Sequence, residues 1–176
     1  GYGSDPALVQ AYSKAFVTGM QGDLTSPHTA VATAKHYIGD GGTWLGKDQG
    51  ETRTSEANLI ATHAPGYFGA LEAGVQTVMI SYSSYADPAA GVSHGKMHGN
   101  RYLITDVLKG RMGFDGLVVS DWNAIEQVEG CTRTHCPQAI NAGVDLIMVP
   151  DDWQKFIDEA VADVEAGRIP MSHVDD

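Results

Sequence analysis

The sequence is poor in basic residues and has no long apolar run. It carries 11 lysines and arginines against 22 aspartates and glutamates, a formal net charge of −11. A surface of this charge repels phosphate backbones and anionic lipids, so we expect neither nucleic acid nor a membrane as a partner. No apolar run approaches the roughly 20 residues that a membrane-spanning helix needs. A neutral ligand such as a sugar meets no electrostatic penalty on approach.

Cysteine is scarce as well, with only Cys131 and Cys136 in one short segment. The interpretation we favour is a short disulfide loop, which would indicate an oxidising compartment. Two reduced cysteines in a surface loop are the first alternative. A zinc site that includes His135 is the second, although no further ligand pair follows at zinc-finger spacing.

Helical and strand-like patterns alternate along the chain. Helices are predicted over residues 5–22, 55–73, 100–112, 137–142 and 152–166. Short apolar strands are predicted over residues 31–35, 76–81, 116–120 and 144–149. Loops are predicted over 39–50 and 82–98, and Pro65 is expected to kink or divide the second helix. Strands that alternate with helices indicate parallel β/α units and the α/β fold class.

Four β/α units are about half of a (β/α)₈ TIM-type barrel, which takes about 250 residues. An open half-barrel exposes two strand edges, which proteins normally avoid. We therefore expect residues 1–176 to be a single domain that is a fragment of a longer enzyme. The first five residues do not resemble a signal peptide.

Polar side chains follow three of the predicted strands directly. Lys35 and His36 follow the first, Tyr82 lies just after the second, and Asp121 follows the third. The carboxyl ends of the strands form the active-site face of a β/α barrel. The sequence therefore predicts that these side chains converge on one ligand.

Asp121 is the sharpest candidate for chemistry, because it follows an apolar strand at the mouth of the sheet. Retaining hydrolysis of a glycoside needs a carboxylate that attacks the anomeric carbon, and a second carboxyl group as acid/base. The alternative is that Asp121 caps the helix that follows.

Five further residues have both a functional and a structural interpretation. Lys35 and His36 can donate to sugar hydroxyls. Lys35 can also form a Schiff base or a buried ion pair, and His36 can be a hydrogen-bonded structural histidine. Tyr82 can orient the nucleophile or pack in the interior. Trp122 can face a pyranose ring or pack against its neighbours. Asp40, in a glycine-rich loop, can bind hydroxyls or form a turn.

Several segments together resemble glycoside hydrolase family 3, in its β-glucosidase and exo-β-glucanase branch. The most specific is Gly-Phe-Asp-Gly-Leu-Val-Val-Ser-Asp-Trp at residues 113–122, with Asp121 at the position of the family's nucleophile. The remaining matches are shorter and stand in the family's order along nearly the whole chain. They are the Tyr-Gly-Ser-Asp at 2–5, the Lys-His pair at 35–36, the loop at 39–43, Tyr82, and the segments at 96–98 and 148–150.

The resemblance implies roles for these residues. Asp121 would attack the sugar, and Tyr82 would orient Asp121. Trp122 would form an apolar wall beside the sugar ring. The sugar hydroxyls would be held by Lys35, His36 and Asp40. It implies no metal and no organic cofactor. The Cys131–Cys136 loop looks like that of Gram-negative bacterial members, which indicates a periplasmic or secreted enzyme.

The resemblance also implies parts that are missing. Family members take an aspartate and an arginine for sugar binding from earlier barrel strands, and usually a glutamate acid/base from a following α/β domain. Nothing in this chain matches them. Residues 84–86 stand where the family usually has Asn-Gly, and an apparent insertion follows through about residue 95. The loop after Lys-His has no histidine. The missing histidine argues against the N-acetylglucosaminide specificity of one sub-branch.

The sequence thus predicts retaining hydrolysis of terminal, non-reducing β-D-glucosyl residues from β-glucosides or β-glucans. Two alternatives from other classes stay open: a Schiff-base lyase built on Lys35, and a carbohydrate-binding fragment that cannot turn over. The expected partners are the sugar substrate, the rest of the barrel and an α/β domain that supplies the acid/base.

Overall fold

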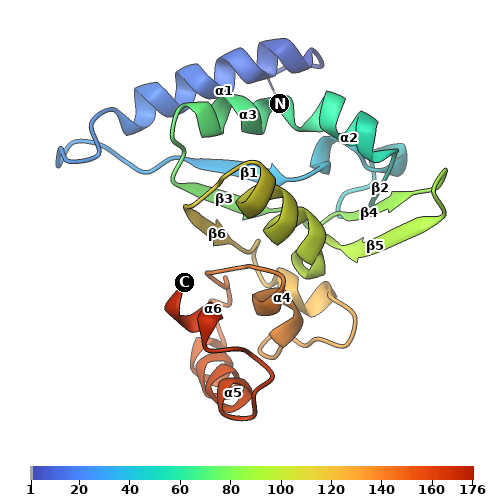
Figure 1. The fold of residues 1–176 in the computed structure, drawn as a ribbon, viewed down its shortest axis with the longest axis vertical. Helices are drawn as coiled ribbons and strands as arrows, with labels where there is room; N and C mark the ends of the chain where they lie inside the picture. Colours follow the sequence, from blue (N-terminus) through green and yellow to red (C-terminus); the bar gives the residue numbers. More distant parts are fainter. Residues whose placement is uncertain (1) are drawn as a thin grey trace.

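The computed structural model describes residues 2–176, which contain two three-stranded sheets flanked by helices (Figure 1). The main sheet runs β1 (Thr33–Tyr37), β3 (Thr77–Ile80), β6 (Leu117–Val119), and all three strands are parallel. Val78 is paired with Ala34 on one side and Val118 on the other, so β3 is the central strand. The predicted α/β class and parallel sheet are confirmed.

Two helices pack together along one side of this sheet (Figure 1). Helix α1 (Pro6–Gln21) begins after Asp5, whose carboxylate accepts the N–H of Ala7 at 2.9 Å. Helix α3 (Pro65–Glu72) approaches α1 so closely at Gly69 that an added Cβ would lie 2.2 Å from a backbone oxygen of α1. The glycine thus sets the spacing of the two helices.

The helix predicted over 55–73 is divided. Helix α2 (Glu56–His63) begins after Ser55, whose hydroxyl accepts the N–H of Asn58 at 3.3 Å, and α3 starts at Pro65. Proline cannot donate the hydrogen bond that would continue a helix. The expected break at this position is confirmed.

A further helix, η4 (Tyr102–Arg111), matches the prediction for residues 100–112. It is a π-helix, and in its last bond Met112 N–H donates to the carbonyl of Val107 at 2.8 Å. Its apolar residues join the same buried cluster as Val78 and Val118 of the sheet. The members of η4 in this cluster are Leu103, Ile104 and Leu108.

The prediction of a loop over residues 82–98 was wrong. The structure has an antiparallel hairpin there, β4 (Ser84–Asp87) and β5 (Val92–Lys96), and β2 (Glu51–Arg53) pairs parallel with β4. The Asp87 carboxylate accepts the N–H groups of Ala89 and Ala90, which closes the turn of the hairpin. The strands of this hairpin are short and of mixed polarity, without a continuous apolar run, so the sequence pattern did not indicate them.

The bounds of the first strand were also wrong, because β1 covers 33–37 rather than 31–35. His36 therefore lies in the strand, and so does Tyr37, which is 1% exposed. The hydroxyl of Tyr37 donates to the carbonyl of Leu103 at 3.0 Å, and this buried bond ties the strand to η4. The glycine-rich segment after it is not a simple loop, since it contains the 3₁₀ turns η1 (Asp40–Gly42) and η2 (Trp44–Gly46).

The fourth strand, predicted over 144–149, is not a regular strand. The segment runs beside β6 but forms a single bridge, between Val119 and Leu146. Two side chains add to its backbone hydrogen bonds: the Asp145 carboxylate accepts Val118 N–H at 2.8 Å, and Ser120 Oγ accepts Met148 N–H at 2.7 Å. The segment still lies as a fourth extended stretch beside β6, at the edge of the sheet.

The C-terminal third forms helices below the sheet in the view of Figure 1. Helices α4 (Pro137–Asn141) and α5 (Trp153–Glu165) match their predictions, whereas α6 (Ser172–Asp175) was not predicted. Within residues 2–176, none of the helices has the length and apolar character to cross a membrane.

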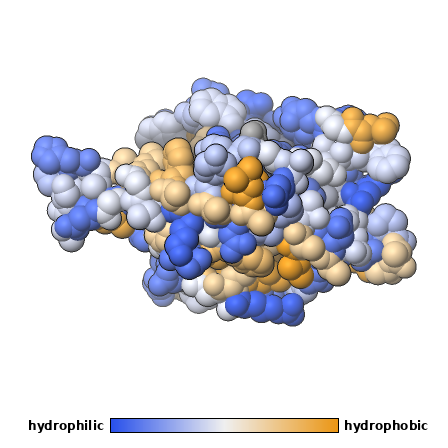
Figure 2. All heavy atoms as spheres, turned by 90° about the horizontal axis from the view of Figure 1, so that it is seen from above, coloured by the Kyte–Doolittle hydropathy of each residue, from blue (hydrophilic) through white to orange (hydrophobic). Residues whose placement is uncertain are grey.

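Helix α1 carries a second apolar face that stays exposed. It presents one large apolar side chain to solvent at each fourth residue, namely Leu8, Tyr12, Phe16 and Met20. Figure 2 views the molecule from the side of α1, and apolar atoms reach the surface there. A solvated helix usually has one apolar stripe and a polar face opposite to it, so this stripe is the kind of surface that another element covers.

Candidate active site

Asp121 lies two residues after the end of β6 (Leu117–Val119), at the carboxyl end of the strand. Its side chain is 14% exposed, and its carboxylate accepts the N–H of Trp122 at 2.8 Å. The short helix that follows, η5 (Ala124–Gln127), has Asn123 at its N-cap position and no side-chain capping bond. The carboxylate of Asp121 therefore does not cap this helix.

His36 brings two of the predicted carboxylates together. Its Nε2 lies 3.4 Å from Asp121 Oδ2, and its Nδ1 lies 3.4 Å from Asp40 Oδ2. The imidazole is contributed by β1, the two carboxylates by the chain after β6 and by η1. Side chains from two segments far apart in the sequence, residues 36–40 and Asp121, thus meet at one edge of the sheet, the edge formed by the carboxyl ends of the strands.

Tyr82 reaches the same place, with a partner that the sequence did not indicate. Its hydroxyl donates to the backbone carbonyl of Trp122, not to the carboxylate of Asp121. Partial burial raises the pKa of Tyr82, and the negative charge of Asp121 raises this pKa further. The hydroxyl is therefore protonated at neutral pH and close to the carboxylate. The side chain of Trp122 is half exposed, with its ring free to meet a ligand.

Lys35 is not drawn into this group of side chains. It is exposed, and among the interactions of residues 2–176 its ammonium takes part in no hydrogen bond or ion pair. The buried ion pair considered for Lys35 is therefore not formed in the structure. Lysines that act through a Schiff base are activated by burial or by a neighbouring cation, and an exposed Lys35 lacks the first of these.

Two residues of β5 and the turn after it were missed as parts of the site. His98 is 1% exposed, and its Nε2 accepts the backbone N–H of Asp121 at 2.9 Å. Lys96 donates to the carbonyls of Gln49 and Tyr82, at 2.9 Å each. The match of residues 96–98 to the family was the only signal of their importance, because spacing alone placed them in a loop.

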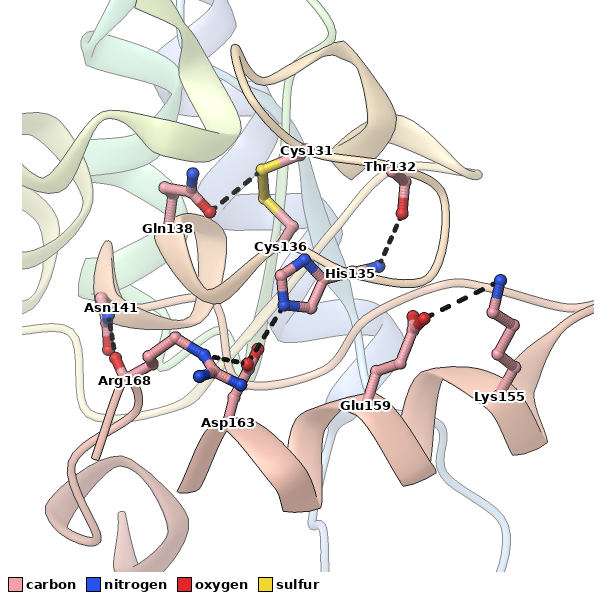
Figure 3. A network of polar contacts seen from close by, with 10 residues as sticks. All are labelled: Cys131, Thr132, His135, Cys136, Gln138, Asn141, Lys155, Glu159, Asp163 and Arg168. Carbon is pink, nitrogen blue, oxygen red and sulfur yellow. Dashed lines mark hydrogen bonds and ion pairs between the residues drawn. A yellow bond between two sulfur atoms is a disulfide. The ribbon is translucent and has the colours of Figure 1, made fainter. Parts of the chain in front are cut away.

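The cysteines lie in a second cluster, beside helix α5 (Figure 3). Cys131 and Cys136 are joined as a disulfide, with their Cα atoms 4.8 Å apart. From the loop they close, His135 Nε2 reaches the carboxylate of Asp163 at 3.1 Å, and Arg168 Nε donates to the same oxygen at 2.6 Å. The disulfide loop is thereby fastened to α5.

We expect the double variant Cys131→Ser/Cys136→Ser to be less stable than the wild type. A disulfide that closes a loop of this size restricts the unfolded chain, which stabilises the fold by about 2 kcal/mol. Its loss should lower the Tm by roughly 4–8 °C. Thermal unfolding followed by circular dichroism measures it. Wild type treated with a thiol reductant is the matched control and should fall to the same Tm. A reductant that leaves the wild-type Tm unchanged would contradict the prediction.

Two hollows of the surface lie away from Asp121. One, of about 510 Å³, lies between the disulfide loop and α5, where Arg133, His135 and Lys155 are among its lining residues. The other, of about 180 Å³, is apolar and lies between the α2–α3 pair and η4, where Leu59 and Phe68 are among its lining residues. Asp121 lines neither of these two hollows.

The part of the chain that the structure describes contains no group of three or more His, Cys, Asp or Glu side chains arranged to hold a metal ion. The zinc alternative at Cys131, His135 and Cys136 therefore has no geometry to support it, because the two sulfur atoms are bonded to each other.

Comparisons with known proteins agree on one family. The family model described as the glycosyl hydrolase family 3 N terminal domain matches residues 1–176. The lysosomal beta glucosidase of Dictyostelium discoideum is 32% identical over 99% of this chain and 22% of its own length. The periplasmic beta-glucosidase of Salmonella typhimurium is 28% identical over 100% of this chain and 22% of its own length.

Solved structures agree with the fold. The exo-1,3/1,4-beta-glucanase ExoP from a Pseudoalteromonas species superposes with a TM-score of 0.93 and 47% identity, over 99% of this chain and 21% of that chain. The beta-glucosidase of Listeria innocua in complex with glucose superposes with a TM-score of 0.83 and 30% identity, over 97% of this chain and 24% of that chain. The prediction of part of a TIM-type barrel is confirmed. The chain spans about a fifth of the curated relatives it matches.

Proposed function

We propose that this chain, which belongs to glycosyl hydrolase family 3, carries the nucleophile of a retaining β-glucosidase-type enzyme. The observation that carries the proposal is the position of Asp121, at the carboxyl end of β6 with its carboxylate 3.4 Å from His36. The substrates are terminal, non-reducing β-D-glucosyl residues of β-glucosides or β-glucans. Relatives named beta-glucosidase and exo-1,3/1,4-beta-glucanase support this substrate class.

In the proposed reaction, the carboxylate of Asp121 attacks the anomeric carbon and a covalent glycosyl-enzyme forms, which water then hydrolyses. One oxygen of the carboxylate already accepts the N–H of Trp122, and the other faces His36. These contacts hold the nucleophile in one orientation. No cofactor or metal is part of the proposal.

The neighbours of Asp121 bind the sugar. His36 and Asp40 offer a donor and an acceptor to hydroxyl groups, and the exposed ammonium of Lys35 can reach a ligand because it is bound to nothing within residues 2–176. The half-exposed ring of Trp122 provides an apolar wall for a pyranose. Tyr82 acts through the backbone carbonyl of Trp122, so it positions the segment that bears the nucleophile.

The acid/base is proposed to come from a further α/β domain, and the rest of the barrel to complete the sheet. The exposed apolar stripe of α1 supports a covering partner, and so does the fraction of the relatives' length that this chain spans. A periplasmic or secreted location is proposed from the Cys131–Cys136 disulfide together with the relatives named periplasmic.

The test is mass spectrometry after incubation with a 2-deoxy-2-fluoro-β-glucoside that has a good leaving group. Such a reagent needs the nucleophile but little help from an acid. We expect an adduct on the peptide that contains Asp121. An adduct on a different carboxylate would sink the assignment of Asp121. No adduct on a chain shown to be folded favours the binding-fragment alternative. Borohydride trapping of a carbonyl substrate on Lys35 would favour the lyase instead.

A further inference from the structure

Four hydrogen bonds, together with the chain that links Lys96 to His98, form a ring around the backbone of Asp121. Lys96 Nζ donates to the carbonyl of Tyr82 at 2.9 Å, and the hydroxyl of Tyr82 donates to the carbonyl of Trp122. Trp122 N–H donates to Asp121 Oδ1 at 2.8 Å, and Asp121 N–H donates to His98 Nε2 at 2.9 Å. His98 is two residues after Lys96, which closes the ring.

The ring joins two elements that are far apart in sequence. Lys96 is the last residue of β5 and His98 lies in the turn η3 (Met97–Gly99), whereas Asp121 follows β6. Met97 between them is 0% exposed, so the turn is anchored in the core. The bond from Asp121 N–H to the imidazole therefore ties the backbone of Asp121 to this buried turn.

The imidazole of His98 must be neutral to accept this bond. Burial lowers the pKa of His98 to about 3, and the positive charge of Lys96 adds to the effect. The acceptor nitrogen is therefore unprotonated at neutral pH, which is the state that accepts the N–H of Asp121.

Lys96 has a similar function on the other side of the ring. Besides the carbonyl of Tyr82, its ammonium holds the carbonyl of Gln49 at the end of the glycine-rich segment. The same ammonium thus fixes the segment after β3 relative to the segment that carries Asp40. Both segments contribute side chains to the candidate site.

We propose that His98 is a positioning residue for Asp121, with Lys96 as its counterpart for Tyr82. The proposal rests on the proposed function, because it concerns the same nucleophile. His98 is buried, and its bond is to the backbone N–H of Asp121 and not to the carboxylate oxygens. It fixes the backbone from which the carboxylate projects, and a displacement of about 1 Å in a reacting group can cost about 100-fold in rate.

The first experiment compares His98→Phe with His98→Gln by the rate at which the fluoroglucoside labels Asp121. Phenylalanine keeps an aromatic ring but has no acceptor, whereas glutamine can place an amide oxygen near the position of Nε2. We expect His98→Phe to be labelled about 10–100-fold more slowly, and His98→Gln to recover most of the wild-type rate. His94→Phe is the matched control, because His94 stacks on Tyr85 in the same hairpin and does not contact Asp121.

The second experiment reads the bond directly and needs no reaction. NMR spectra of ¹⁵N-labelled wild type and His98→Phe are compared, and the ring signals missing from the variant are assigned to His98. We expect these signals to be those of a neutral imidazole with Nε2 unprotonated. We also expect the backbone amide signal of Asp121 to shift in the variant. A protonated Nε2, or His98→Phe labelled at the wild-type rate, would overturn the proposal. If the NMR result is as expected and wild type forms no adduct on Asp121, the proposed function fails while the positioning contact stands.

Discussion

Asp121→Asn is expected to lower the rate of labelling by the fluoroglucoside by at least about 10³-fold. An amide is a poor nucleophile toward an anomeric carbon, so no covalent intermediate forms. The substitution preserves shape, and the amide oxygen can still accept the N–H of Trp122, the bond that measures 2.8 Å in the wild type. The loss should therefore be one of chemistry and not of folding.

The matched control is Asp115→Asn. Asp115 is exposed and lies before β6, at the opposite end of the strand from Asp121. It should be labelled at the wild-type rate. Thermal unfolding of both variants checks that neither has lost its fold. If Asp121→Asn still forms the adduct, the nucleophile is another residue and the proposed function of Asp121 is wrong.

Asp163→Asn is expected to lower the free energy of unfolding by about 2–3 kcal/mol, or the Tm by roughly 4–12 °C. Asp163 is 1% exposed, and one of its carboxylate oxygens accepts from both His135 and Arg168 (Figure 3). These charge-assisted bonds hold the disulfide loop and the chain after α5 on the helix. The neutral amide weakens both bonds and removes the negative charge beside the guanidinium of Arg168.

The stabilisation by Asp163 depends on pH in a defined direction. Burial by itself raises the pKa of Asp163, but the bonds and positive charges of Arg168 and His135 outweigh burial and hold this pKa below its usual value. The carboxylate therefore stabilises the fold fully above about pH 4–5 and loses this effect as pH falls through the lowered pKa. The Tm difference between wild type and Asp163→Asn should shrink below about pH 4.

Asp158→Asn on the same helix is the control for this prediction. Asp158 is exposed and takes part in no ion pair within the described residues. Its substitution should change the free energy of unfolding by less than about 0.5 kcal/mol. A loss in Asp163→Asn no larger than the loss in this control would show that the network beside the disulfide does not stabilise the fold.

The sequence by itself determined the α/β class, the three parallel strands and the positions of the main helices. Strong local signals explain this success: the apolar runs around Val78 and Val118 are typical of strands covered on both faces, and Pro65 marks the break between α2 and α3. The sequence also determined the residue on which the proposed chemistry depends, because Asp121 follows its strand directly within a specific motif.

Only the tertiary structure decided how the site is held together. The hairpin β4–β5 was missed because its pairing joins short strands of mixed polarity, and without it His98 had no place near Asp121. The partner of Tyr82 is a backbone carbonyl, which no side-chain pattern encodes. Lys35 and His36 are adjacent in sequence, but only His36 meets the carboxylates. Such contacts form between segments that the fold brings together, so they depend on strand register and on turns whose local sequence signals are weak.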